Sequence, residues 1–325
     1  MRSPKNPALR ELGILIALAV VVGVTAIVNP LFLSGQGIRD LLLNACLVAL
    51  LTVGQTMVVI TRNVDLSVGS VLGLSAFITA DTFAVNPVLA VVVGIAVGAL
   101  CGLFNGVLVG LGKVPSLVVT LGTLSVFRGL DFMWAHGRQI NAANLPDGFL
   151  ALGSGSVFGV PYLVIITLVV LAIAALHLGS YRSGRELYAI GSNPEAAVLV
   201  GIPVGRRVFT TFLVSGTVAG LAGVLAVARY GTVDATVGTG LELQVISAVV
   251  VGGVAIFGGS GTVAGAALGA LLLSTIGSAL EVVHIAQFWQ QAITGALLIA
   301  AIALDRGVAL RVAARLRRQS RGVSA

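Results

Sequence analysis

Long uncharged runs alternate with short polar segments along the whole chain. An α-helix needs about 20 apolar residues to cross the hydrocarbon core of a bilayer. Most of the runs approach that length, so the pattern predicts an all-α polytopic membrane protein with about ten transmembrane helices. The expected spans cover about residues 12–28, 41–61, 66–79, 88–110, 116–134, 162–178, 208–228, two spans within 243–280 that turn at 257–261, and 288–304.

The first run has two interpretations. Arg2, Lys5 and Arg10 precede it, and residues 24–26 (Val-Thr-Ala) would serve as a cleavage site for a signal peptide. We prefer an uncleaved first span, because further spans follow and the run is long for the apolar core of a signal peptide.

The basic residues indicate how the spans are oriented. With the N-terminus inside, only Arg39, Arg128, Arg138 and Arg229 of the 19 lysines and arginines fall in spans or loops outside the cytoplasmic segments. Cytoplasmic loops are enriched in Lys and Arg, so both termini are expected in the cytoplasm. We expect one transmembrane domain over 1–325, made of a cytoplasmic N-terminus (1–11), a membrane core (12–305) with a cytoplasmic loop (180–207), and a basic cytoplasmic tail (306–325).

The order of the spans suggests an inverted repeat. Spans two to five begin outside and spans seven to ten begin inside, which is the parity that such a repeat requires. Residues 99–109 and 266–276, both rich in small side chains, lie in corresponding places.

The composition excludes several classes of protein. Hydrophobic residues make up 57% and charged residues 10%, whereas soluble domains are about 25% charged. Cys46 and Cys101 lie in apolar runs, so neither a disulfide framework nor a metal cluster is expected. Gly112-Lys113 is followed by Val114 instead of Ser or Thr, so it is not a phosphate-binding loop. No catalytic constellation is recognisable, so we expect no enzyme activity and no cofactor on this chain. We attribute the net charge of +7 to the Lys and Arg of the expected cytoplasmic segments.

The cytoplasmic loop contains the signals of a short helix at 193–201. Asn193 suits an N-cap, Pro194 the first helical position, and Glu195 the positive end of the helix dipole. Gly201 can adopt the left-handed conformation that ends a helix. The helix is expected to dock on a partner, with a solvated connecting helix as the alternative.

A few charged residues lie in or next to the spans, where they are costly and therefore informative. Asp65 begins the third span, and we expect it to cap that helix, with a role in gating or transport as the alternative. Arg128 and Asp131 are three residues apart and are expected to pair on one helical face, with substrate contact as the alternative. Glu242 and Glu281 lie at outer ends of spans, either solvated or in a proton relay.

Four motifs, in order between about residues 50 and 305, resemble the permease subunits of bacterial ATP-driven sugar importers of the ribose-permease type. The family was identified from Asn63-Val-Asp-Leu-Ser-Val-Gly-Ser70; from Asn105-Gly106, Lys113-Val-Pro-Ser116, Thr120-Leu-Gly-Thr123 and Arg128-Gly129; from Glu195-Ala196-Ala197 with Gly201; and from Gly238-Thr-Gly-Leu-Glu242 through 251–253 to 258–261.

The resemblance implies partners and roles that the residues alone do not show. A binding protein would deliver a sugar to the outer face of the bacterial cytoplasmic (inner) membrane, two identical or sister permeases would form the path, and separate ATPase subunits would bind ATP and magnesium. The 193–201 helix would couple to the ATPase through Asn193, Pro194, Glu195, Ala196, Ala197 and Gly201. Candidate gating or pathway residues would be Asp65, Ser67, Asn105, Thr120, Arg128 and Glu242.

The expected substrate is a monosaccharide or a similar small polyol, such as rhamnose, ribose or autoinducer 2. Residues 62–64 (Arg-Asn-Val) replace the family's commoner Gly-Gly-Ile, and with Phe288-Trp289 they look closest to rhamnose and autoinducer-2 permeases. A secondary transporter coupled to ions through Asp65, Glu242 or Glu281 is the alternative function. A structural or sensory membrane protein is a third class, but no sensor or effector domain is recognisable.

Overall fold

The protein is a bundle of helices with a single short hairpin in the part of the chain that the structure describes. A computed structural model describes residues 7–285, 289, 292–293, 295–296 and 299. Seven helices there are long and apolar enough to cross a membrane, which confirms a polytopic membrane protein. They are α1 (Pro7–Val28), α2 (Gly35–Ile60), α4 (Pro87–Gly106, continued by the π-helical turn η2, Val107–Leu111), α5 (Ser116–Ala135), α7 (Tyr162–Ser180), α10 (Val204–Tyr230) and α12 (Val263–Val282).

Two apolar helices are too short to cross a bilayer alone. They are α3 (Val68–Thr82) and α11 (Leu241–Val251). Of the two spans expected within 243–280, α12 is long enough to cross a membrane and α11 is not, and the expected turn at 257–261 lies between them. The tenth expected span and the basic tail lie, apart from a few positions, outside the described residues.

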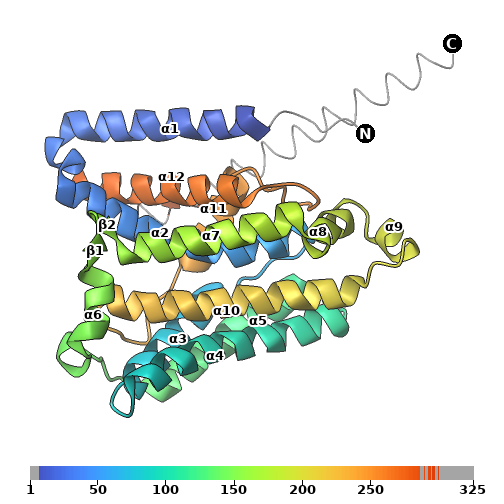
Figure 1. The fold of residues 1–325 in the computed structure, drawn as a ribbon, viewed down its shortest axis with the longest axis horizontal. Coiled ribbons are helices and arrows are strands. Elements are labelled where there is room, and N and C mark those ends of the chain that lie inside the picture. The colour runs from blue at the N-terminus through green and yellow to red at the C-terminus, as the bar shows by residue number, and fades with distance from the viewer. Residues whose placement is uncertain (1–6, 286–288, 290–291, 294, 297–298, 300–325) are drawn as a thin grey trace.

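The long helices run side by side, and short connecting elements lie at the two ends of the bundle (Figure 1). At one end lie α8 (Arg182–Ser192) and α9 (Pro194–Leu199). At the other end, the segment between α5 and α7 contains η3 (Ala142–Asn144), α6 (Asp147–Ser154) and the hairpin of β1 (Ser156–Val157) and β2 (Val160–Pro161). A 3-10 turn, η1 (Pro30–Leu33), joins α1 to α2.

Burial separates the central helices from the peripheral ones. Nearly all of the apolar window of α2 is buried, as is most of that of α10, whereas α1 is largely exposed. Glycines allow α4 and α10 to pack closely: a Cβ atom on Gly98 would overlap the carbonyl oxygen of Gly216, and one on Gly216 would overlap the backbone of Gly98 and Gly102. Such close contact through small residues is typical of helices packed in membranes.

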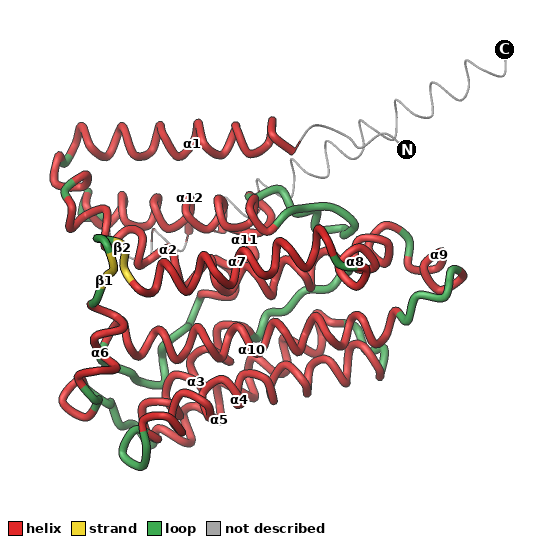
Figure 2. Tube along the Cα trace, in the orientation of Figure 1, coloured by secondary structure: helices red, strands yellow, loops and turns green. Residues whose placement is uncertain are grey.

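Two non-helical segments run between the helices, and each leads into a short helix (Figure 2). Residues 61–67 connect the end of α2 to α3, and residues 231–240 connect the end of α10 to α11. Irregular backbone at membrane depth is tolerated where protein buries it or where it lines a cavity. These two segments therefore mark the part of the bundle in which a functional site is expected.

Candidate functional site

A cavity of about 360 Å³ lies between α2, α10, α11, α12 and the 231–240 segment. Its volume is within the range of small-molecule sites. Four hydroxyl groups and two amides contribute to its wall: those of Thr236, Thr239, Ser274 and Ser278, and those of Asn44 and Gln244. Tyr230 and Glu281 complete the polar lining.

The lining can exchange hydrogen bonds with an uncharged polar molecule. Hydroxyls and amides both donate and accept, and the buried hydroxyl of Ser274 has no hydrogen-bond partner among the described residues. Glu281 is the one charged side chain in the described part of the lining. The chemistry of the wall therefore suits a neutral polyhydroxy compound.

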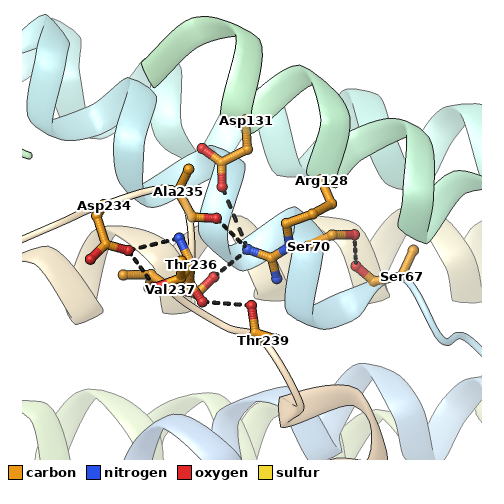
Figure 3. Close-up of polar contacts among 9 residues, drawn as sticks. All are labelled: Ser67, Ser70, Arg128, Asp131, Asp234, Ala235, Thr236, Val237 and Thr239. Carbon is orange, nitrogen blue, oxygen red and sulfur yellow. Dashed lines mark hydrogen bonds and ion pairs between the residues drawn. The ribbon is translucent and has the colours of Figure 1, made fainter. Parts of the chain in front are cut away.

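The 231–240 segment forms one wall of the cavity and is held by its own polar groups (Figure 3). The Asp234 carboxylate accepts hydrogen bonds from the backbone N–H of Thr236 at 2.7 Å and from its hydroxyl at 2.5 Å. The hydroxyl of Thr239 donates to the Thr236 carbonyl at 2.6 Å. Gly238 has a φ of +81°, which an L side chain would strain. These features fix a turn that presents Thr236 and Thr239 to the cavity.

Arg128 of α5 holds the same segment by hydrogen bonds to its backbone (Figure 3). Its Nη1 donates to the carbonyl oxygens of Ala235 at 3.0 Å and Val237 at 2.7 Å. The expected pair with Asp131 is confirmed, with 3.6 Å between Arg128 Nη1 and Asp131 Oδ2. Arg128 is absent from the described lining, so it acts on the cavity by positioning the backbone of the wall.

Asp65 does not cap α3, contrary to the expectation from sequence. The N-cap residue is Ser67, whose side chain makes no cap hydrogen bond. Asp65 Oδ1 accepts instead from the backbone N–H and hydroxyl of Ser67, and Oδ2 accepts from the Ser215 hydroxyl of α10 at 2.8 Å. Asn105 of α4 donates to the Ser67 hydroxyl at 2.9 Å. These four buried side chains tie the 61–67 segment to α4 and α10.

The remaining two candidate pathway residues also lie beside the non-helical segments. Thr120 of α5 donates to the carbonyl oxygens of Ser116 at 2.9 Å and Val64 at 3.2 Å. Glu242, in the first turn of α11, accepts from the backbone N–H of Gly240 at 3.2 Å. None of the six candidates is among the described lining residues, and their roles in transport stay predictions.

Sequence reasoning did not single out most of the cavity lining. It noted Glu281 and, within the Gly238–Glu242 motif, Thr239, but not the other hydroxyls or the amides of the lining. One signal was available: Ser274 and Ser278 are four residues apart in a strongly apolar helix, so they lie on one face of α12.

At the cytoplasmic end predicted from charge, the capping signals of the 193–201 helix are confirmed. Asn193 Oδ1 accepts from the backbone N–H of Ala196 at 3.0 Å, and Gly201 has a φ of +79°. The helix, α9, leaves Val198, Leu199 and Val200 exposed, with Leu199 at 88%.

The preceding helix, α8, was not predicted from sequence. Its Glu186 accepts from Arg207 Nε of α10 at 2.6 Å and from Arg182 Nε at 2.8 Å. These hydrogen bonds, that from Arg207 first, hold the pKa of Glu186 below its usual range. Arg207 therefore links α8 to the start of α10 through the Glu186 carboxylate, and the hydrogen bond from Arg182 lies within α8 itself.

Comparison with known proteins gives the family. Residues 37–302 match the family described as branched-chain amino acid transport system / permease component. The chain is 36% identical to the autoinducer 2 import system permease protein LsrC of Enterobacter sp. (strain 638) over 91% of this chain and 86% of that protein. It is 34% identical to the ribose import permease protein RbsC of Bacillus subtilis (strain 168) over 92% and 93% of the two chains.

A third relative is the D-allose transport system permease protein AlsC of Escherichia coli (strain K12), 32% identical over 94% of this chain and 95% of that protein. No solved structure matches the chain. The apolar helices, the family match and the near full-length relatives agree. The chain therefore belongs to the branched-chain amino acid transport system / permease component family, and it is a multi-pass membrane permease of the bacterial ABC importer type.

Proposed function

We propose that this permease carries a monosaccharide or a similar small polyol into the cytoplasm, driven by an ATPase on a separate chain. The single observation that carries the substrate class is the cavity, whose described lining has hydroxyls, amides and one carboxylate. Three relatives are named for autoinducer 2, ribose and D-allose. Small polar compounds with several hydroxyl groups match that wall, because each hydroxyl both donates and accepts.

The proposed topology has ten membrane-embedded elements, cytoplasmic termini and an inverted repeat within one transmembrane domain. The arrangement of the helices supports the repeat. A long helix, α2, leads through a non-helical segment into the short α3, and α10 leads likewise into α11. Broken helices at corresponding positions of two repeats mark the substrate sites of many transporters, and the cavity lies beside the second break.

The proposed partners follow from the importer architecture. An ATPase subunit, which binds ATP and magnesium, docks on α9 at the end of the bundle that carries α8 (Figure 1). The exposed Val198, Leu199 and Val200 supply apolar surface for that contact. A binding protein delivers the substrate at the opposite end, and a second permease, identical or sister, completes the transporter.

Reconstitution tests this function against ion-coupled transport. The permease is placed in vesicles with its ATPase and binding protein, and uptake of labelled ribose, rhamnose and autoinducer 2 is followed. Uptake of at least one compound is expected to require ATP and the ATPase chain. Uptake driven by a proton or sodium gradient without the ATPase would refute the proposal.

A charge reversal tests the docking site. Glu195→Arg is expected to reduce co-purification with the ATPase and ATP-dependent uptake, because it places a positive charge at the positive end of α9 and alters the docking surface. The matched control is Asp147→Arg, which makes the same change in the first turn of α6 at the opposite end of the bundle. Equal co-purification of both variants with the ATPase would count against α9 as the docking site.

A further inference from the structure

Arg62 occupies a backbone position that favours glycine. It lies just beyond α2, with a φ of +65°, and its N–H donates to the Val59 carbonyl at 2.9 Å. Helices commonly end on a residue of this left-handed conformation, and glycine adopts it without steric cost. An arginine at this position is therefore expected to make side-chain contacts that offset the backbone strain.

That contribution is a pair of hydrogen bonds to the end of α8. Arg62 Nε donates to the Gly191 carbonyl at 2.6 Å, and Nη2 donates to the Ser192 carbonyl at 2.8 Å. The last carbonyls of a helix lack partners within it, and a cation near them is favourable. Two donors in one rigid plane suit this contact, which the single nitrogen of a lysine would not reproduce. The next residue, Asn193, caps α9.

The connection between α11 and α12 is a third segment that contacts the ends of α2 and α8. The Gly259 N–H donates to the Ile60 carbonyl at 2.9 Å, and the Tyr188 hydroxyl of α8 donates to the Gly261 carbonyl at 2.9 Å. A Cβ atom on Gly191 would overlap the Ile60 carbonyl oxygen. The ends of α2 and α8 are therefore in direct backbone contact, with Arg62 across them.

From Arg62 the chain leads directly to the cavity. Three residues later, Asp65 is fixed to Ser67 and to Ser215 of α10. The α3 helix that follows packs its Gly69 against Gly238 of the cavity wall. The Leu72 side chain of the same helix lines the cavity. A displacement of α8 and α9 can thus reach the cavity through one continuous, packed segment.

We propose that Arg62 is a positioning residue that transmits movement of the ATPase-docking helices to the 61–67 segment and so to the cavity. This inference rests on the proposed function, because it takes α9 as the contact with the ATPase. Arg62 thus keeps its strained backbone conformation because its side chain joins the end of α2 to the end of α8, two helices that are distant in sequence.

The glycine variant separates this role from folding. Arg62→Gly removes both hydrogen bonds, one of which is exposed to solvent, but it also relieves the backbone strain, so the unfolding temperature is expected to fall only slightly. Lys113→Gly is the matched control. Lys113 also has a positive φ, of +57°, at the end of the α4–η2 run, but its side chain has no hydrogen bond or ion pair among the described residues.

The measurements are made on the permease reconstituted with its ATPase and binding protein. For Arg62→Gly, ATP-driven uptake of the transported polyol is expected to fall about fivefold or more, with co-purification of the ATPase unchanged and more ATP hydrolysed per molecule transported. Lys113→Gly is expected to keep the ratio of ATP to substrate. Arg62→Lys has one donor nitrogen, and its rate of ATP-driven uptake is expected to lie between those of Arg62→Gly and the unsubstituted permease.

Two results would overturn the inference. One is Arg62→Gly with the uptake rate and ATP ratio of the unsubstituted permease. The other is a clear drop in the unfolding temperature of Arg62→Gly, with uptake in Arg62→Gly and Arg62→Lys falling in proportion to their unfolding temperatures, which would make the contact a fold-stabilising one. If the unsubstituted complex shows no ATP-driven uptake, the proposed function itself fails, and that result is seen before any variant is compared.

Discussion

Replacing Arg128 by methionine tests how the cavity wall is held. The substitution keeps much of the apolar stem and removes the guanidinium. Two charge-assisted hydrogen bonds to the carbonyls of Ala235 and Val237 are lost, each contributing about 1.5–3 kcal/mol. Asp131, whose side chain is 0% exposed, then remains buried without its partner.

The expected cost follows from that orphaned carboxylate. Breaking a buried ion pair by removing one partner destabilises proteins by about 3–5 kcal/mol. Removing both charges, as in Arg128→Met with Asp131→Leu, is expected to recover part of this loss. Full recovery is not expected, because the Ala235 and Val237 carbonyls still lack their donor. The Arg128→Lys variant keeps the charge but not the geometry of the guanidinium. Its free energy of unfolding is expected to lie between those of Arg128→Met and the unsubstituted protein.

Two assays read the effect. Equilibrium unfolding in mixed micelles gives the free energy of unfolding for the single and double variants. A cysteine at Thr239, labelled from the outer face, reports the position of the wall, and its labelling rate is expected to rise in Arg128→Met. A free energy of unfolding within about 1 kcal/mol of the unsubstituted protein, with unchanged labelling, would refute the role given to Arg128.

Two further predictions concern packing and pH. Gly216→Ala is expected to lower the free energy of unfolding by about 1–3 kcal/mol, because the new Cβ overlaps the backbone of α4. The control Gly122→Ala, whose Cβ faces open space, is expected to leave the stability unchanged or to raise it. Equal shifts of the unfolding temperature in the two variants would contradict this prediction. Since Arg207 lowers the pKa of Glu186 in the fold, the stabilisation from Glu186 is present above its unfolded pKa of about 4.3 and is lost as the pH falls through the lower folded value. Glu186→Gln should therefore weaken the fall of the unfolding temperature below about pH 4, and an unchanged pH profile would exclude this link.

Elements that depend on local chemistry were predictable from the amino-acid sequence. Apolar runs identified the long helices, because crossing a bilayer imposes length and apolarity on each segment separately. The cap at Asn193 and the turn at Gly201 were predictable because capping involves residues three or four positions apart. The Arg128–Asp131 pair was predictable for the same reason.

The contacts between those elements, in contrast, became known only from the folded arrangement of the helices. Arg128 meets Ala235 and Val237, Asp65 meets Ser215, and Arg62 meets Gly191, all across long separations in sequence. The cavity likewise collects its polar groups from four helices and one non-helical segment. In a membrane, lipid and protein interior are equally apolar, so hydropathy does not show which face of a helix points inward. Packing decides that, and with it which hydroxyls line the cavity and which only bond to their own helix.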